Sequence, residues 1–174
     1  MDIAKKEYSS KAEMYAAMAL HIKESFQETT DICAALSNIS AMLALYLEHV
    51  NWAGFYIMKN VPEHGKGQML VLGPFQGKPA VALIEAGSGV CGTAVESRTQ
   101  QRVDDVTRCC NHIACDVATA SEIVTPIFVN GGVWGVIDID SPLPSRFDEE
   151  DEDGMKLLAE TLGELLGRPS TMDM

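Results

Sequence analysis

Apolar residues in the first third of the chain recur at the spacing of amphipathic helices. Met14, Met18, Ile22 and Phe26 lie on one stripe, and Ser10-Lys11-Ala12-Glu13 before them has the pattern of a capping box. A polar stretch at 28–31 ends this run. A second stripe with the same spacing then predicts another core-facing helix, formed by Ile32, Leu36, Ile39, Leu43 and Leu47.

From Asn51 onward the pattern becomes that of strands. Apolar and aromatic runs bounded by turn residues predict strands at 52–58, 69–72, 80–85, 122–129 and 133–140. Asn130-Gly131-Gly132 is a hairpin signal between the last two runs. Gly87-Ser88-Gly89 precedes a short helix at 90–96, and residues 104–119 follow neither period, which indicates a long loop of the kind that carries function.

A further helix is predicted to begin near Asp148, with an acidic first turn that suits the positive end of a helix dipole. Its apolar face holds Met155, Leu158, Leu162 and Leu165. Two helices, a run of strands and a closing helix predict an α+β fold with a largely antiparallel sheet. Because no repeat or low-complexity linker is visible, we expect an N-terminal helix at 1–28, one domain at 29–168 and a tail at 169–174.

Charge and cysteine content narrow the class of protein. The 174 residues include 13 basic and 25 acidic ones, which gives a formal charge of −12 and disfavours binding to nucleic acid or to anionic membranes. No run of about 18 apolar residues exists, and no apolar signal core follows the first residues. We therefore expect a cytoplasmic protein with reduced cysteines, namely Cys33, Cys91, Cys109, Cys110 and Cys115.

Two of these cysteines have neighbours that suggest chemistry. Cys91 lies at the start of the short predicted helix, where backbone N–H groups favour a thiolate. Cys115 lies in the long loop, three residues after His112. A cysteine is also a small apolar residue that is often simply buried, so the functional interpretation depends on what surrounds it.

Three carboxylates complete the candidate site. Glu122 lies on one predicted strand, and Asp138 and Asp140 lie two residues apart on the next, so the two aspartates point to the same face. Two aspartates on an otherwise apolar strand are costly unless they bind or pair with something, although Asp140 before Ser141-Pro142 could also form a turn. The cysteine spacings match no common paired zinc-ligand pattern, so we expect no metal.

Several stretches carry a family resemblance. They are Asn51-Trp52-Ala53-Gly54-Phe55-Tyr56, Leu72-Gly73-Pro74-Phe75-Gln76-Gly77-Lys78, Gly89-Val90-Cys91-Gly92-Thr93-Ala94, His112-Ile113-Ala114-Cys115-Asp116, Ser121-Glu122-Ile123-Val124, Gly135-Val136-Ile137-Asp138-Ile139-Asp140-Ser141 and the acidic helix start from Arg146-Phe147 to Glu152. From about Asn38 to Leu166 the chain resembles the free methionine-(R)-sulfoxide reductases, a family of GAF-domain enzymes. The resemblance implies a single GAF-like domain with about six antiparallel strands flanked by helices.

The resemblance also implies roles for individual residues. Cys115 matches the family's nucleophile, and Cys91 matches a cysteine that forms a disulfide with it, although the helix start at Cys91 keeps the reverse assignment open. The carboxylates that surround the substrate match Glu122, Asp138 and Asp140, and Trp52 matches an aromatic wall of the pocket. Either Glu122 or Asp138 is expected to be the protonated partner that supplies a proton to the sulfoxide oxygen.

One position departs from the family. Bacterial relatives carry a third cysteine where this chain has Val81. Cys91 must then resolve the intermediate, or the auxiliary thiols Cys109 and Cys110 do, and the pair is equally compatible with an incidental surface feature. The implied partners are free methionine (R)-sulfoxide and a thioredoxin-type reductant, with no bound cofactor, and the sequence is compatible with a homodimer. The rival hypotheses are a non-catalytic ligand-binding GAF module and a thiol redox sensor.

Overall fold

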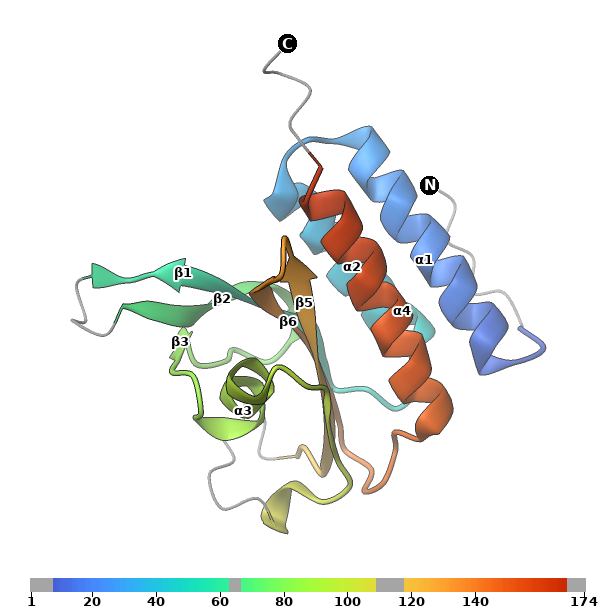
Figure 1. Cartoon of the computed structure of the whole chain (residues 1–174). Coiled ribbons are helices and arrows are strands. Elements are labelled where there is room, and N and C mark those ends of the chain that lie inside the picture. Colours follow the sequence, from blue (N-terminus) through green and yellow to red (C-terminus); the bar gives the residue numbers. More distant parts are fainter. Residues whose placement is uncertain (1–7, 63–66, 109–117, 169–174) are drawn as a thin grey trace.

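A computed structural model describes residues 8–62, 67–108 and 118–168 (Figure 1). The helices in this part of the chain are α1 (Lys11–Glu28), α2 (Ile32–Tyr46), α3 (Gly89–Ser97) and α4 (Glu149–Leu166), with a 3-10 turn at Val106–Arg108. The strands are β1 (Trp52–Asn60), β2 (Gln68–Gly77), β3 (Leu83–Ile84), β4 (Gln101–Val103), β5 (Ser121–Val129) and β6 (Gly132–Ser141). They form one antiparallel sheet in the order β3-β2-β1-β6-β5-β4, which confirms the predicted fold class.

The sheet separates two layers of packing. In Figure 1, α1, α2 and α4 lie together on one side of the sheet and α3 lies on the other. Ile123 and Ile137 pack into the larger core with the three long helices, whereas Val124 and Val136 pack into a smaller core beneath α3. Since neighbouring residues of a strand point to opposite faces, each central strand supplies both cores. Among the described helices, none has both the length and the apolar character that crossing a membrane requires.

Most predicted elements are present, and the errors have local causes. Strand β2 continues to Gly77 through Pro74, beyond the predicted end at 72, because Pro74 falls in an irregularity of the β1–β2 pairing, where a proline is tolerated. The predicted strand at 80–85 shrinks to Leu83–Ile84. The polar segment Gln101–Val103, for which the sequence predicted no element, forms an edge strand. A 3-10 turn at Val106–Arg108 lies at the beginning of the predicted loop at 104–119.

Two details at the helix starts also differ from the prediction, namely the exposure of Ile32 and the hydrogen bonds that cap α1. Ile32 begins α2 but is 42% exposed rather than core-facing, because it occupies the first turn beyond the edge of the helix layer. At α1, the Ser10 side chain accepts from the Glu13 N–H as expected of an N-cap, but the Glu13 carboxylate accepts from Ser9 instead of from the cap residue.

The hairpin between β5 and β6 turns at two residues. Val129 pairs with Gly132, and Asn130 and Gly131 between them have φ values of 49° and 78°. Positive φ at both central positions defines the turn type whose twist matches that of antiparallel strands, and asparagine followed by glycine adopts it at low cost. The turn starts the pairing of the two strands, and a register shift between Ile127 and Phe128 then moves it by one residue, so that Glu122 lies opposite Asp140.

A buried carboxylate ties α1 to the start of α4. Asp151 has no exposed surface and accepts hydrogen bonds from Tyr15 (2.8 Å), Lys11 Nζ (2.7 Å) and Arg146 Nη1 (2.9 Å). Asp151 and Asp148 also form a reciprocal capping box at the helix start. Two cations and a hydroxyl thus compensate one buried charge, and α1 becomes part of the same folded unit as the sheet.

We expect Asp151→Ala to lower the free energy of unfolding by roughly 3 kcal/mol, because removing one partner of a buried ion pair leaves the others uncompensated. Urea unfolding followed by circular dichroism measures the change. The matched control is Asp153→Ala in the same helix, whose side chain is 83% exposed and which should change stability by less than about 0.5 kcal/mol. Equal effects of the two substitutions would contradict the structural role of Asp151.

Candidate active site

Strand register places the three candidate carboxylates on one face of the sheet. Glu122 on β5 lies directly opposite Asp140 on β6, and Asp140 in turn lies opposite Trp52 on β1. Asp138 is two residues before Asp140 and therefore points to the same face. Each of the three carboxylates is at most 5% exposed. The predicted same-face arrangement is confirmed, and it extends from the two aspartates across to Glu122 and Trp52.

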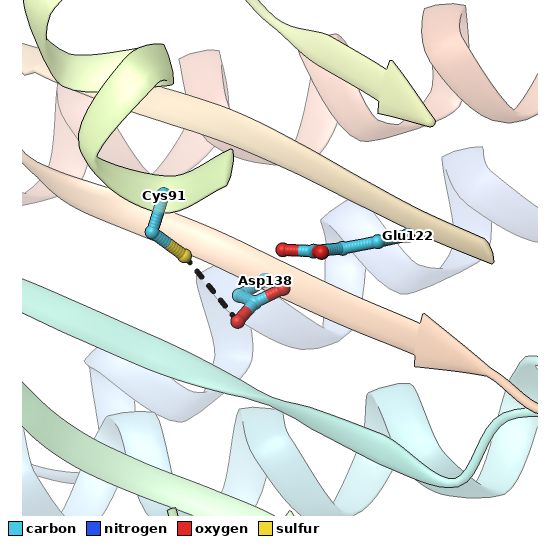
Figure 2. A group of neighbouring side chains, drawn as sticks. All are labelled: Cys91, Glu122 and Asp138. Atoms are coloured by element: carbon cyan, nitrogen blue, oxygen red, sulfur yellow. Dashed lines mark hydrogen bonds between the residues drawn. The ribbon is translucent and has the colours of Figure 1, made fainter. Parts of the chain in front are cut away.

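Helix α3 brings Cys91 onto this face. Gly89 enters the helix with a φ of 62°, which favours glycine, and any side chain at Gly92 would collide with the carbonyl of Glu85. These glycines let the first turn of α3 pack tightly against the chain before it, with Cys91 directed at the sheet. The Cys91 thiol donates a hydrogen bond to Asp138 Oδ2 at 3.3 Å, and Figure 2 shows Glu122 directed toward the same point from β5.

Burial favours the protonated forms of Glu122 and Asp138. Burial, and then the negative charge of Asp140, raises the pKa of Glu122 well above that of an ordinary carboxyl group. The pKa of Asp138 is raised in the same way by burial and by the charge of Glu122. Like charges this close favour retention of a proton between the two carboxyl groups at neutral pH.

The expectation that Cys91 is a ready thiolate was wrong for this arrangement. Burial raises the pKa of the Cys91 thiol well above its usual value, and the charges of Asp138 and Glu122 raise it further. The partial positive charge of a helix start is worth little against these effects. Cys91 therefore rests as a thiol that donates to a carboxylate.

A small cavity adjoins these side chains. Its volume is about 10 Å³, enough for a single water molecule. Its described lining consists of Ile84, Ser88, Gly89, Val90, Cys91, Glu122, Asp138 and Asp140. The sequence identified 87–89 only as a helix entry, and the role of Ser88 and Val90 as walls follows from the docking of α3.

Trp52 lies on the same face but does not line that cavity. Its ring stacks between Phe75 and Tyr56, with centroid distances of 5.2 Å and 6.0 Å, and its Nε1 donates to the carbonyl of Lys78 at 3.1 Å. Trp52 is completely buried in this stack. Its contribution to substrate binding stays a prediction.

The remaining cysteines fall into two groups, those outside the described residues and one exposed cysteine far from the carboxylates. Cys109, Cys110 and Cys115 lie outside the described residues, so their predicted roles stay predictions. Cys33 is exposed on α2, away from the carboxylates. Val81, which replaces the third family cysteine, is 39% exposed just before β3, and its carbonyl accepts a hydrogen bond from Tyr56.

One group of side chains in the described part of the chain has donor atoms close enough to hold a metal ion. Cys91, Glu122 and Asp138 each offer an atom that lies within 4.8 Å of the others. The cysteine spacings led us to expect no metal, but that argument considered only sites built from cysteine pairs, whereas this group combines one thiol with two carboxylates.

Comparison with known proteins places the chain in a family. A model of the GAF domain matches residues 21–166. The free methionine-R-sulfoxide reductase of Escherichia coli is 43% identical over 157 residues, which cover 90% of this chain and 91% of the relative. The chain belongs to the free methionine-R-sulfoxide reductase family of GAF-domain proteins. This membership confirms the resemblance inferred from the sequence motifs.

Both a solved structure of the reductase family and a further sequence relative match this chain over nearly its whole length. The free methionine-R-sulfoxide reductase of Neisseria meningitidis, determined in complex with its substrate, superposes with a TM-score of 0.83 and is 36% identical, with 95% of each chain covered. The Bacillus subtilis protein YtsP is 45% identical over 163 residues, or 94% of this chain and 97% of YtsP. The similarity therefore extends over α1 as well as over the sheet.

The raised carboxyl pKa values predict a pH dependence of stability. Since the folded state holds protons on Glu122 and Asp138 more tightly than the unfolded state, the free energy of unfolding should fall as pH rises above the ordinary carboxyl pKa of about 4. Asp138→Asn removes one of the interacting charges and should make this fall shallower, with a higher urea midpoint at pH 8. Asp153→Asn, on an exposed side chain, serves as the control. A pH profile of Asp138→Asn identical to that of the wild type would contradict the assignment.

Proposed function

We propose that this protein reduces free methionine (R)-sulfoxide to methionine with its own thiols. The observation that supports this most strongly is the buried cluster of Glu122, Asp138 and Asp140 against Cys91, in a chain that belongs to a family whose named members are free methionine-R-sulfoxide reductases. The family supplies the reaction class, and the cluster supplies groups suited to it.

The carboxylates favour a free amino acid over a methionine sulfoxide within a polypeptide. The described residues that line the cavity include the three carboxyl groups of Glu122, Asp138 and Asp140, and no lysine or arginine. Such a lining attracts the ammonium group of a free amino acid, whereas a residue inside a chain has only a peptide N–H. We assign this ammonium-binding role to Asp140.

The chemical step needs a nucleophile and a proton. We assign the attack on the sulfoxide sulfur to Cys115, while a proton from the Glu122–Asp138 pair moves to the sulfoxide oxygen. The oxygen then leaves methionine as the hydroxyl group of a Cys115 sulfenic acid. The sulfur of the substrate is reduced and the cysteine sulfur is oxidised, so the step balances without a metal or an organic cofactor.

Cys91 is suited to the second step. Its hydrogen bond to Asp138 and its raised pKa disfavour it as the first attacking thiolate. As resolving thiol it would condense with the sulfenic acid to form a disulfide, with loss of water. A thioredoxin-type dithiol would then exchange with this disulfide and restore both thiols, which requires a reducing compartment such as the cytoplasm.

We expect Cys115→Ser to abolish turnover of free methionine (R)-sulfoxide, because the substitution removes the nucleophile. Cys91→Ser should keep turnover with dithiothreitol and lose it with a thioredoxin system. Product formation from each sulfoxide epimer, measured by chromatography, tests both, and Cys33→Ser is the control with an exposed cysteine away from the site. If the reduced wild-type protein turns over neither epimer, the reductase proposal is wrong, and a ligand-binding or redox-sensing module remains.

We expect Glu122→Gln and Asp138→Asn to lower kcat by roughly 100-fold or more, because positioned proton donors contribute at least that much. Asp140→Asn should act mainly through a raised KM, since its charge is assigned to the ammonium group. Steady-state kinetics with dithiothreitol separate the two effects, with Asp153→Asn as the matched surface control. A kcat effect confined to Asp140→Asn would reverse these assignments.

A further inference from the structure

We propose that the reduced protein binds one zinc ion through Cys91, Glu122 and Asp138. The three side chains come from α3, β5 and β6, and they meet at one point beneath the helix (Figure 2). One donor atom from each lies within 4.8 Å of the others. A thiolate and two carboxylate oxygens are ordinary zinc ligands, and three protein ligands leave a fourth position open.

The existing distances are close to those of a zinc site. Zinc bound at about 2.3 Å from sulfur and about 2.0 Å from oxygen in a tetrahedron separates these two ligands by roughly 3.5 Å. The Cys91 thiol and Asp138 Oδ2 are already 3.3 Å apart. The Glu122 donor atom lies within 4.8 Å of the other two, and rotation of its side chain would bring it to a ligand distance.

The surroundings favour a cation. Cys91, Glu122 and Asp138 are each at most 5% exposed, and Asp138 Oδ1 has no hydrogen-bond partner in the described part of the chain. On binding, the divalent ion replaces the protons held by the thiol and the carboxyl groups, which leave to solvent. The adjoining cavity of about 10 Å³ has room for the water molecule that would fill the fourth position.

Zinc at this point would act as an inhibitor. It would occupy the carboxyl groups of Glu122 and Asp138, which are assigned to proton transfer, and the thiol assigned to resolution, so it should compete with methionine (R)-sulfoxide and be reversed by a chelator. This consequence rests on the proposed function. The binding site itself does not, and it is tested without substrate.

Cobalt(II) serves as the spectroscopic probe for zinc. We would titrate it into the reduced full-length protein and into a variant in which Cys33, Cys109, Cys110 and Cys115 are serine, so that Cys91 is the only thiol. We expect a thiolate-to-cobalt absorption band that saturates at one ion per chain in both proteins and is abolished by adding zinc. Circular dichroism of the four-serine variant verifies its fold, and zinc titration calorimetry of the wild type against Cys91→Ser provides a second test independent of that variant.

Two substitutions decide the ligand set. In either background, Cys91→Ser should remove the band and Asp138→Asn should weaken cobalt binding at least about tenfold, whereas Asp153→Asn should leave it unchanged. No band from a folded protein that retains Cys91, or equal affinities for Asp138→Asn and wild type, would overturn the zinc proposal. If the wild-type protein shows the cobalt band but no reductase activity, the metal site is supported and the proposed function is wrong. If it is an active reductase but shows no band, the proposed function is supported and the metal site is wrong.

Discussion

The main constraint on this structure is that three carboxyl groups, those of Glu122, Asp138 and Asp140, are buried on the face of one antiparallel sheet. Glu122 and Asp138 lie in the two strands with the most buried surroundings, and no basic side chain is among the described residues that line the cavity beside them. Such charges are unfavourable in a protein interior unless protons or ligands compensate them. The architecture makes this tolerable by packing a large apolar core on the opposite face, so that folding does not depend on the face that carries the chemistry.

The two faces of the sheet have different roles. One packs against the long helices and stabilises the fold, and the other carries a buried carboxyl cluster that can still bind a ligand or a proton. Ile123 and Ile137 anchor β5 and β6 to the long helices, while the residues beside them in sequence face α3. The short α3 covers the carboxylates and delivers Cys91, whose proton is held by Asp138. A ligand that supplies positive charge relieves the repulsion within the cluster, so binding and protonation are coupled through the same few atoms.

The sequence could predict much of this arrangement, because alternation and helical spacing are local signals. The two-residue offset of Asp138 and Asp140 gave their common face, and the asparagine-glycine turn indicated the hairpin that aligns Glu122 with them. The protonation state of the Cys91 thiol could not be predicted in the same way. Its pKa depends on Asp138, 47 residues away in the chain, and a helix start seen in isolation suggested the opposite direction. Edge strand β4 was missed because Gln101–Val103 is polar and has only one neighbouring strand.

The hydrogen bonds of Arg146 connect the start of α4 to the ends of the strands that carry the carboxyl cluster. Its guanidinium bonds Asp151 and the carbonyl of Glu48, just before β1, while its backbone N–H donates to Ser121 at the start of β5. Lys11 Nζ donates to the same oxygen as Arg146, Asp151 Oδ2. Loss of Lys11 would therefore remove one of the two cations on the carboxylate that also binds Arg146. Truncation of α1 would in this way affect the strand ends next to Glu122, although no residue of α1 is among the described residues that line the cavity.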